Sequence, residues 1–391
     1  MGVLALNCGS SSVKFRLFDV EPSGAGEEQE RCLARGVVEG LPAGEAVLTV
    51  RVGERVERQT VALRGHEASV RHLLARLTEP RAGLWVIAAV GHRVVHGGEW
   101  FTEPTLSDAR LLAGLEALEE LAPLHNVPSL AGIRAARAVL GPGVPMVAVF
   151  DTAFHASLPE RAARYAIPSD LAQRLGVRRF GFHGLSYQSV LARYCRLTGT
   201  PSERATVVAL HLGNGCSAVA IKNGRSVDTS MGFTPLEGLV MGTRSGDLDP
   251  AIVGYLARKE GVTVETVEEW LNGRSGLLGL SGLSHDMRTL LAREVDHPGA
   301  RLALEVFCYR ARKYLGAYLA VLGGAQAIVF TGAIGENSPE IRARISEGMQ
   351  WCGLRLDPAL NARVIGVEAR ISPPDALLPA YVIPTDEELI I

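Results

Sequence analysis

The sequence predicts an α/β fold made of two domains with similar architecture. This prediction rests on two stretches, residues 3–19 and residues 206–222. Each is expected to form a strand, a turn of small residues and a second strand in succession. The run Val144–Phe150 has only apolar side chains, as is typical of a strand covered on both faces by helices. With 391 residues, the chain is long enough for each domain to have its own core.

The first domain is expected over residues 1–150. Short runs rich in β-branched and apolar residues alternate there with Gly, Pro and charged turns, a pattern that indicates strands. The expected strands are 3–8, 13–19, 33–38, 46–52, 58–63, 85–90 and 144–150. Helical spacing of apolar residues predicts helices over 67–77 and 109–121.

The second domain is expected over residues 151–382. Its predicted elements are strands at 206–212 and 217–222, a long helix at about 302–322, and a strand at 327–330. The apolar run Tyr318–Gly335 is interpreted as a helix followed by a strand, not as a membrane span, because Gly323-Gly324 interrupts it. The Pro-rich segment Pro373–Pro384 is expected to return the last residues, about 383–391, to the first domain.

Composition excludes several classes of protein. A net charge of −2 provides no basic surface for nucleic acid, and we expect neither nucleic acid nor a membrane as partner. Six cysteines lie far apart without a C-x-x-C pair, so neither a zinc site nor a disulfide framework is indicated. We expect a cytoplasmic protein without a signal peptide.

The turn Asn7-Cys8-Gly9-Ser10-Ser11-Ser12-Val13-Lys14 is the most informative short segment. Backbone N–H groups and hydroxyls of such a turn suit a phosphate, and Lys14 adds a compact positive charge. Only four of the 40 basic residues are lysines, so a lysine here stands out. The segment joins two strands and does not match a Walker A sequence. An ordinary polar β-turn is the alternative interpretation.

Polar side chains also gather where apolar strands end, which is where open α/β sheets bind their ligands. These side chains are Arg93, His125, Asp151, His183 and Arg244. Each one alone has a structural explanation; Asp151, for example, is placed to cap the segment after it. Two arginines, two histidines and a carboxylate beside glycine-rich turns together favour a catalytic site.

Nine segments in order along the chain resemble the acetokinase family of the actin-like ATPase superfamily. They are Asn7–Lys14, Gly91–Gly98, Asp151–His155, Arg179–Gly184, His211–Gly215, Asp228–Pro250, Ser275–Arg288, Phe330–Ser338 and Ile383–Glu388. The resemblance implies two duplicated ribonuclease-H-like (actin-like ATPase) domains with an interdomain active-site cleft. It also implies reversible transfer of the ATP γ-phosphoryl group to acetate, giving acetyl phosphate and ADP, by a homodimer that uses Mg²⁺ or, alternatively, Mn²⁺.

The resemblance assigns roles to matching residues. Asn7 and Glu387 would hold the metal ion, and Arg93 would hold the substrate carboxylate. The catalytic residues would be Asp151, His183, Arg244 and His125. Val95, Leu124, Phe182 and Pro235 would form the pocket for the acetate methyl group. The nucleotide-binding residues would be Ser10, Ser12, Lys14, His211, Leu212, Gly213, Asn214, Gly215, Asp286, Met287, Arg288, Ala333, Ile334, Gly335, Glu336 and Asn337.

Elementary chemistry agrees with these roles. A carboxylic acid with a pKa of roughly 4 to 5 is already ionised at neutral pH, so the nucleophile needs no general base. The obstacle is repulsion between this anion and the triphosphate, which positive groups and in-line positioning relieve. We therefore expect Asp151 to orient His183, an arginine or a metal-bound water rather than to remove a proton.

Three segments depart from the family pattern. The family's F-H-G-T-S-H reads Phe182–Tyr187 here, so Tyr187 replaces the second histidine. Its T-A-G-I-G-E-N reads Thr331–Asn337 with Gly and Ala exchanged, and its P-L-H-N-P turn reads Pro123–Pro128 with the proline moved by one.

Two alternatives stay open. A propionate or butyrate kinase differs from an acetate kinase only in pocket volume, and Val95 in the methyl pocket favours acetate. A non-catalytic actin-like ATPase shares the fold, but it has no need for the five polar residues named above.

Overall fold

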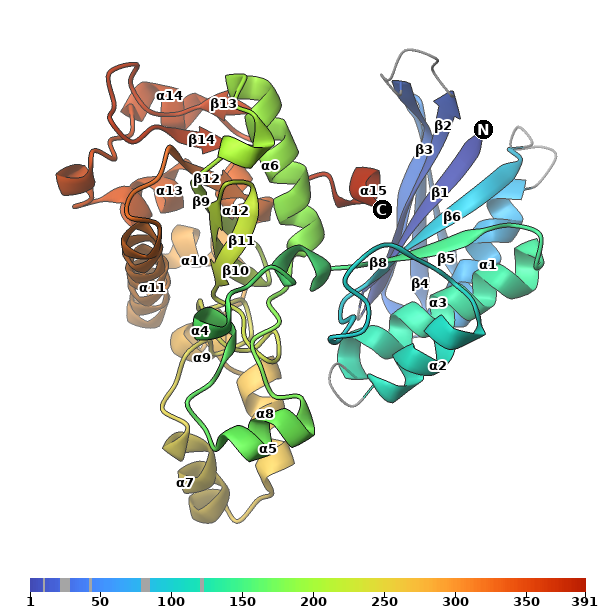
Figure 1. Cartoon of the computed structure of the whole chain (residues 1–391), viewed down its shortest axis with the longest axis horizontal. Coiled ribbons are helices and arrows are strands. Elements are labelled where there is room, and N and C mark those ends of the chain that lie inside the picture. The colour runs from blue at the N-terminus through green and yellow to red at the C-terminus, as the bar shows by residue number, and fades with distance from the viewer. Residues whose placement is uncertain (10, 22–28, 42–43, 79–84, 120–122) are drawn as a thin grey trace. The chain divides into compact units, whose positions relative to one another are not determined.

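The computed structural model describes residues 1–9, 11–21, 29–41, 44–78, 85–119 and 123–391, and for residues 21, 29 and 123–125 only the backbone. The chain forms two compact units (Figure 1). Unit 1 contains Met1–Ala153 and Glu387–Ile391, and unit 2 contains Phe154–Asp386. The last residues therefore belong to unit 1.

Within its described residues, unit 1 has a sheet with the strand order β5-β4-β3-β2-β1-β6-β8-β7. The strands are β1 Gly2–Cys8, β2 Ser12–Glu21, β3 Gln29–Glu39, β4 Ala46–Val52, β5 Arg55–Val61, β6 Ile87–Val94, β7 Thr105–Leu106 and β8 Met146–Phe150. Strands β1 to β5 form an antiparallel meander. Strands β1, β6 and β8 run parallel, so their carboxyl ends lie at one edge of the sheet.

Helices α1 Gly65–Thr78 and α3 Pro123–Leu140 pack against each other and cover one face of this sheet, and α2 Ala109–Ala117 packs against α3. Their apolar side chains meet alternate residues of the strands, as the two-residue period of a strand requires. Leu73 and Leu74 of α1 and Ala135 and Ala136 of α3 share one core with Leu4 of β1. The short helix α15 Glu387–Ile390 lies against β1.

Unit 2 repeats this order of strands. Its sheet runs β11-β10-β9-β12-β14-β13, with an antiparallel meander of β9, β10 and β11 and parallel pairing of β9, β12 and β14. The strands are β9 Val207–Leu212, β10 Cys216–Lys222, β11 Arg225–Thr229, β12 Ala327–Thr331, β13 Ala369–Arg370 and β14 Ala380–Val382. The same sequence of antiparallel and parallel neighbours in both sheets indicates a duplicated domain.

Two helices enclose the unit 2 sheet. Helix α6 Gly184–Thr198 packs Tyr187, Val190 and Tyr194 against alternate residues of β9 and β10. The long helix α11 Pro298–Leu322 also contacts β9 and β10 and lies on the other side of them in Figure 1. The remaining helices are α4 Glu160–Ala163, α5 Ser169–Leu175, α7 Ala251–Glu260, α8 Val264–Gly273, α9 Gly276–Ser281, α10 Met287–Arg293, α12 Gly332–Asn337, α13 Pro339–Ser346 and α14 Pro358–Arg363.

The predicted α/β fold with two similar sheets is confirmed, with local differences. The predicted helix 109–121 ends at Ala117, since Leu118 leaves helical geometry. The predicted strand 85–90 continues to Val94 because it pairs with β8 up to Phe150. Helix α3, which the sequence did not predict, begins in the Pro123–Pro128 segment and contains Pro128. Tyr318–Gly335 is a helix followed by a strand, as expected, and none of the described helices has the length and apolarity of a membrane span.

Candidate active site

In unit 1, three neighbouring parallel strands bring polar side chains to one edge of the sheet. Asn7 lies near the end of β1, Arg93 near the end of β6, and Asp151 directly after β8. The backbone N–H of Asp151 donates to the carbonyl of Val94 (3.1 Å), which fixes the start of this loop against β6. The strand order alone therefore places these three residues together.

Arg93 and Asp151 form a bidentate ion pair. Arg93 Nε donates to Asp151 Oδ1 (2.9 Å), and Nη2 donates to Oδ2 (2.6 Å). A third donor, Nη1, reaches Asn7 Oδ1 (3.0 Å). The Asp151 side chain is 1% exposed and that of Arg93 16% exposed, so the pair is nearly dry. Two of the five guanidinium N–H groups remain available to a further acceptor.

Glu387 completes the set that we call the arginine–carboxylate cluster: Asn7, Arg93, Asp151 and Glu387. Its Oε2 lies 4.0 Å from Arg93 Nη1 and accepts a long hydrogen bond from Asn7 Nδ2 (3.4 Å). Burial raises the pKa of Glu387, and the negative charge of Asp151 acts in the same direction, while Arg93 and Lys14 oppose them. Burial disfavours the charge on Arg93, but Asp151 and Glu387 outweigh it and raise the pKa of the guanidinium.

The segment that delivers Glu387 is held tightly against unit 1. A Cβ atom added to Gly91 of β6 would lie 2.3 Å from the carbonyl oxygen of Ile391, so only glycine permits this approach. Near the same edge, Gly9 donates its N–H to the carbonyl of Ser12 (2.9 Å), and Lys14 is exposed on β2 opposite Asn7. Ser10 lies outside the described residues.

Unit 2 contains a second set, the histidine–arginine cluster: His183, His211, Ser217 and Arg244. His183 precedes α6 with φ 59°, a left-handed conformation that non-glycine residues rarely adopt. Its Nδ1 lies 2.8 Å from Ser217 Oγ on β10, and its ring stacks on His211 of β9 at 4.2 Å. His211 Nδ1 is in turn 2.8 Å from Ser186 Oγ.

Arg244 lies beside the same turn of unit 2. A Cβ added to Gly215 would lie 3.1 Å from Arg244 Nη2 and 3.3 Å from His183 Nε2, so both side chains approach Gly215. Arg244 Nη1 donates to the carbonyl of Pro235 (2.6 Å). No carboxylate of the described chain forms an ion pair with Arg244, and burial lowers its pKa. Within the part of the chain that the structure describes, this partly buried cation therefore has no counter-ion.

A pocket of about 640 Å³ opens next to the Gly213–Gly215 turn. We call it the α12–α13 pocket. Eight predicted nucleotide residues line it: Gly213, Asn214, Asp286, Met287, Arg288, Ala333, Ile334 and Asn337. Asp286 caps α10 by accepting from the N–H of Thr289 (2.9 Å), a bond that lowers its pKa. The pocket thus combines the start of α10 with that of α12.

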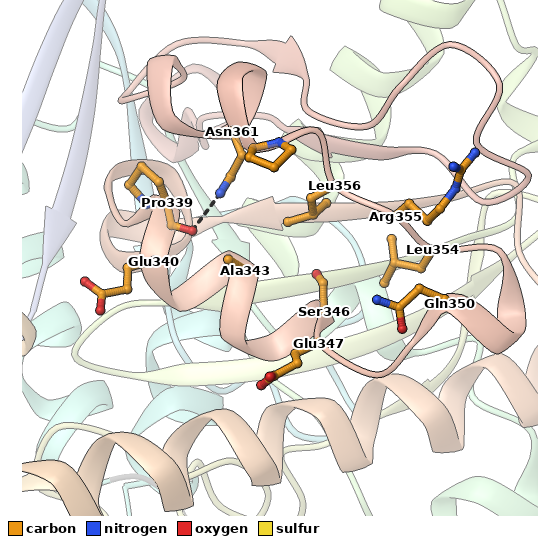
Figure 2. A pocket seen from close by; sticks show the side chains of 11 residues that line it. Pro339, Glu340, Ala343, Ser346, Glu347, Gln350, Leu354, Arg355, Leu356 and Asn361 are labelled. Carbon is orange, nitrogen blue, oxygen red and sulfur yellow. Dashed lines mark hydrogen bonds between the residues drawn. The ribbon is translucent and has the colours of Figure 1, made fainter.

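A fully buried arginine fixes the α12–α13 wall of this pocket. The Arg342 guanidinium donates hydrogen bonds to the carbonyls of Gly335 and Glu336 in α12. It also donates to the side-chain oxygen and the carbonyl of Asn361 and to the carbonyl of Val364. Burial lowers its pKa to about 10. Asn361 also donates to the carbonyl of Pro339 (2.7 Å), as Figure 2 shows, at one end of a second pocket of about 460 Å³. The first turn of α13 is therefore held in place.

Comparison with known proteins decides the family. The acetokinase family model matches residues 2–391. The chain belongs to the acetokinase family. An acetate kinase from Solibacter usitatus is 51% identical over 100% of this chain and 96% of its own length. The crystal structure of Porphyromonas gingivalis acetate kinase is similar at 39% identity and a TM-score of 0.90, covering 100% of this chain and 97% of the other.

A propionate kinase from Francisella tularensis is also similar, with 37% identity, a TM-score of 0.90 and coverage of 100% of this chain and 97% of the other. The resemblance predicted from sequence is therefore confirmed, as is the actin-like ATPase fold with two α/β domains.

The other residues expected from the acetokinase pattern have varied surroundings. Val95 and Phe182 are buried, and Pro235 is half-buried. The side chains of Leu124 and His125 lie outside the described residues. Leu212 is fully buried, and Gly335 and Glu336 do not line the α12–α13 pocket. Instead, Glu336 Oε1 accepts from the N–H groups of Gly332 (2.9 Å) and Thr385 (3.1 Å).

Several residues at these sites were not found by sequence reasoning. Ser217 contacts His183, and Tyr187 contacts Ser217, although neither was assigned a role. The four-residue spacing of His183 and Tyr187 at the start of a helix is the signal that would have paired them. Leu291, Ser338 and Glu340 also line the α12–α13 pocket. Ser338 ends a family segment and the other two lie next to such segments, which is the signal that pointed there.

Proposed function

We propose that this acetokinase is an acetate kinase that transfers the γ-phosphoryl group of ATP reversibly to acetate. Support comes from two relatives named acetate kinase, which are 51% and 49% identical over the whole of this chain. The two clusters described above support the proposal as well. Both clusters supply what the reaction needs, namely positive groups that relieve repulsion between a carboxylate and a polyphosphate.

The observation that carries this proposal is the uncompensated Arg244 beside His183. A partly buried guanidinium without a carboxylate partner is costly unless an anion neutralises it. His183 Nε2 approaches the same glycine, so two donors are ready for one group of oxygen atoms. We assign both residues to stabilising the phosphoryl group during transfer.

We assign substrate binding to Arg93 and orientation of Arg93 to Asp151. The bidentate pair fixes the plane of the guanidinium and leaves two N–H donors for the acetate carboxylate. Both carboxylate oxygens of Asp151 accept hydrogen bonds from Arg93, so we do not assign Asp151 as a general base. This choice selects one of the three roles expected for Asp151 from the sequence.

Asn7 and Glu387 suit a divalent cation shared with phosphate oxygens. Mg²⁺ in kinases usually binds one or two carboxylates together with substrate phosphates and water. Glu387 fits, because burial raises the pKa of its carboxylate, and its described contacts are a long hydrogen bond from Asn7 and a 4.0 Å approach to Arg93. When bound, Mg²⁺ or Mn²⁺ would neutralise phosphate charge. We assign this pair to the metal ion and the α12–α13 pocket to the nucleotide.

A hydroxamate assay tests the activity directly. Hydroxylamine traps acetyl phosphate as acetohydroxamate, and we expect a signal that requires ATP, Mg²⁺ and acetate. Omission of Mg²⁺ is the control for the metal. ATP binding or hydrolysis without hydroxamate formation would contradict the proposal and favour an actin-like ATPase that does not act as an acyl kinase.

A short-chain acyl kinase with another preference is the second candidate, since a propionate kinase is structurally as similar as an acetate kinase. One methylene changes binding in an apolar pocket by about 1–3 kcal/mol. We expect kcat/KM for acetate to exceed that for propionate and butyrate by about tenfold or more. The reverse order would reassign the substrate.

We also propose a homodimer, on the family resemblance alone. Sedimentation velocity at micromolar concentration tests it, with a single species of twice the 41.7 kDa chain mass as the expected result.

A further inference from the structure

Two buried hydroxyl groups line up behind His183. Tyr187 Oη lies 2.5 Å from Ser217 Oγ, and Ser217 Oγ lies 2.8 Å from His183 Nδ1. Tyr187 and Ser217 are both 0% exposed, so water does not compete for these contacts. Tyr187 follows His183 by one helical turn of α6, and Ser217 reaches in from β10.

Counting protons decides the direction of these hydrogen bonds. Ser217 has one hydroxyl proton and can donate either to His183 or to Tyr187. If it donates to Tyr187, the Tyr187 proton has no acceptor among the contacts that the structure describes. A buried O–H group without a partner is strongly disfavoured. The favoured arrangement is therefore Tyr187 donating to Ser217 and Ser217 donating to His183 Nδ1.

This arrangement determines which ring nitrogen of His183 carries a proton. Nδ1 accepts from Ser217, so the proton of a neutral imidazole lies on Nε2. Nε2 is the atom that approaches Gly215 together with Arg244 Nη2. The proton thus points to the position where Arg244 also presents its donors.

We propose that Tyr187 and Ser217 form a hydroxyl relay that holds His183 in the Nε2-protonated tautomer, ready to donate to the phosphoryl group. This inference rests on the proposed role of His183 in phosphoryl transfer. Tyr187 and Ser217 are positioning residues, since they act through His183 and not on the substrate.

The phenol of Tyr187 is suited to donate a hydrogen bond to Ser217 at all neutral pH values. Burial raises the pKa of its phenol, so the group keeps its proton throughout the neutral range. Tyr187 also stands where the family pattern carries a histidine, a side chain that can present either a donor or an acceptor. In this chain the residue at this position therefore always has a proton to donate to Ser217.

The test uses the full-length chain with Tyr187→Phe and Ser217→Ala, and Tyr194→Phe as the matched control. Tyr194 lies on the same helix and is also buried, but its hydroxyl interacts with Thr198 and Thr200. ¹⁵N NMR of histidine-labelled protein at pH 8 without substrate reports the protonation of each ring nitrogen. Loss of one pair of signals in His183→Gln identifies His183.

We expect the unsubstituted chain to show a protonated Nε2 and an unprotonated Nδ1 at His183. Tyr187→Phe leaves His183 Nδ1 as the acceptor for the Ser217 proton, so Nε2 should stay protonated. The Ser217–His183 hydrogen bond then loses the donor that polarises it, and kcat is expected to fall about twofold. Ser217→Ala removes the partner of Nδ1, so a mixture of tautomers is expected. We expect kcat to fall about tenfold, by analogy with loss of the outer partner of a metal-bound histidine. KM values should stay within twofold of the unsubstituted chain, and Tyr194→Phe should change neither readout.

A double variant sharpens the test, because a relay predicts that Tyr187→Phe adds nothing in a Ser217→Ala background. A proton on Nδ1 of His183 in the unsubstituted chain, an unchanged tautomer in Ser217→Ala, or an unchanged kcat in Tyr187→Phe would overturn the relay. The NMR readout needs no substrate, whereas hydroxamate formation by the unsubstituted chain tests the proposed function. Failure of one is therefore distinguishable from failure of the other.

Discussion

Arg93 of unit 1 and Arg244 of unit 2 have opposite surroundings. Arg93 forms a bidentate ion pair with Asp151, and Glu387 lies nearby. Arg244 has a hydrogen bond to the Pro235 carbonyl and no carboxylate in ion-pair distance within the described residues. Under the proposed roles, Arg93 is neutralised by the protein and positioned before the substrate arrives, whereas Arg244 would be neutralised by a bound anion.

Removal of Arg244 should have the largest effect on activity. If it stabilises the phosphoryl group during transfer, Arg244→Ala should lower kcat by about 10³- to 10⁵-fold, as loss of an arginine finger does. The hydroxamate assay measures this change. The control is Arg274→Ala, which removes a guanidinium that packs over the Trp270 ring (5.5 Å) and should stay within twofold. A tenfold loss or less in Arg244→Ala would contradict the role.

Stability should separate the two arginines. Arg93→Ala leaves the buried carboxylate of Asp151 unpaired, so the free energy of unfolding should fall by about 3–5 kcal/mol. Arg244→Ala removes a cation that has no counter-ion and should leave this free energy unchanged or higher. Urea unfolding followed by circular dichroism measures both. If both variants lost the same free energy of unfolding, Arg93 and Arg244 would not differ in how the protein neutralises them.

Arg342 provides a third case, a fully buried cation whose five donors all reach neutral oxygen atoms. Arg342→Lys keeps a charge but leaves several of these acceptors unsatisfied, so we expect a loss of about 3 kcal/mol in urea unfolding. The KM for ATP should rise as the wall of the α12–α13 pocket loosens, while the KM for acetate should not change. An unchanged KM for ATP would show that Arg342 serves stability alone.

His92 of β6 should cause the smallest of these effects. Burial and the charge of Arg137 lower its pKa to about 3 from an ordinary 6.5. Between these values the unfolded chain binds a proton that the folded chain does not, so stability falls as pH falls. The expected loss between pH 7 and pH 5 is about 2 kcal/mol. In urea unfolding at both pH values, His92→Leu should show a smaller difference than the unsubstituted chain.

The sequence predicted the strands and the polar residues at their ends because both depend on local patterns. Asn7, Arg93 and Asp151 each follow or end an apolar run, and parallel pairing then places them at one edge. The return of Glu387 to unit 1 was expected from the Pro-rich tail and the family pattern rather than from any local signal.

Other features depend on contacts that no local pattern records. Helix α3 begins at Pro123 and contains Pro128, two residues that suggested a turn. Packing of its apolar face against α1 and the sheet outweighs that signal. Arg342 was one arginine among many in the sequence, and its five bonds become visible only when α12, α13 and α14 are placed together.

Glu387 lies beyond the whole of unit 2 in the order of synthesis. A ribosome makes residues 154–386 after Asp151 and before Glu387, which takes roughly 10–50 s at the usual 5–20 residues per second. A nascent chain can form the antiparallel meander of unit 1 early, but it lacks α15 and its carboxylate during that interval. Unit 1 therefore lacks the carboxylate that we assign to the metal ion until unit 2 has been translated.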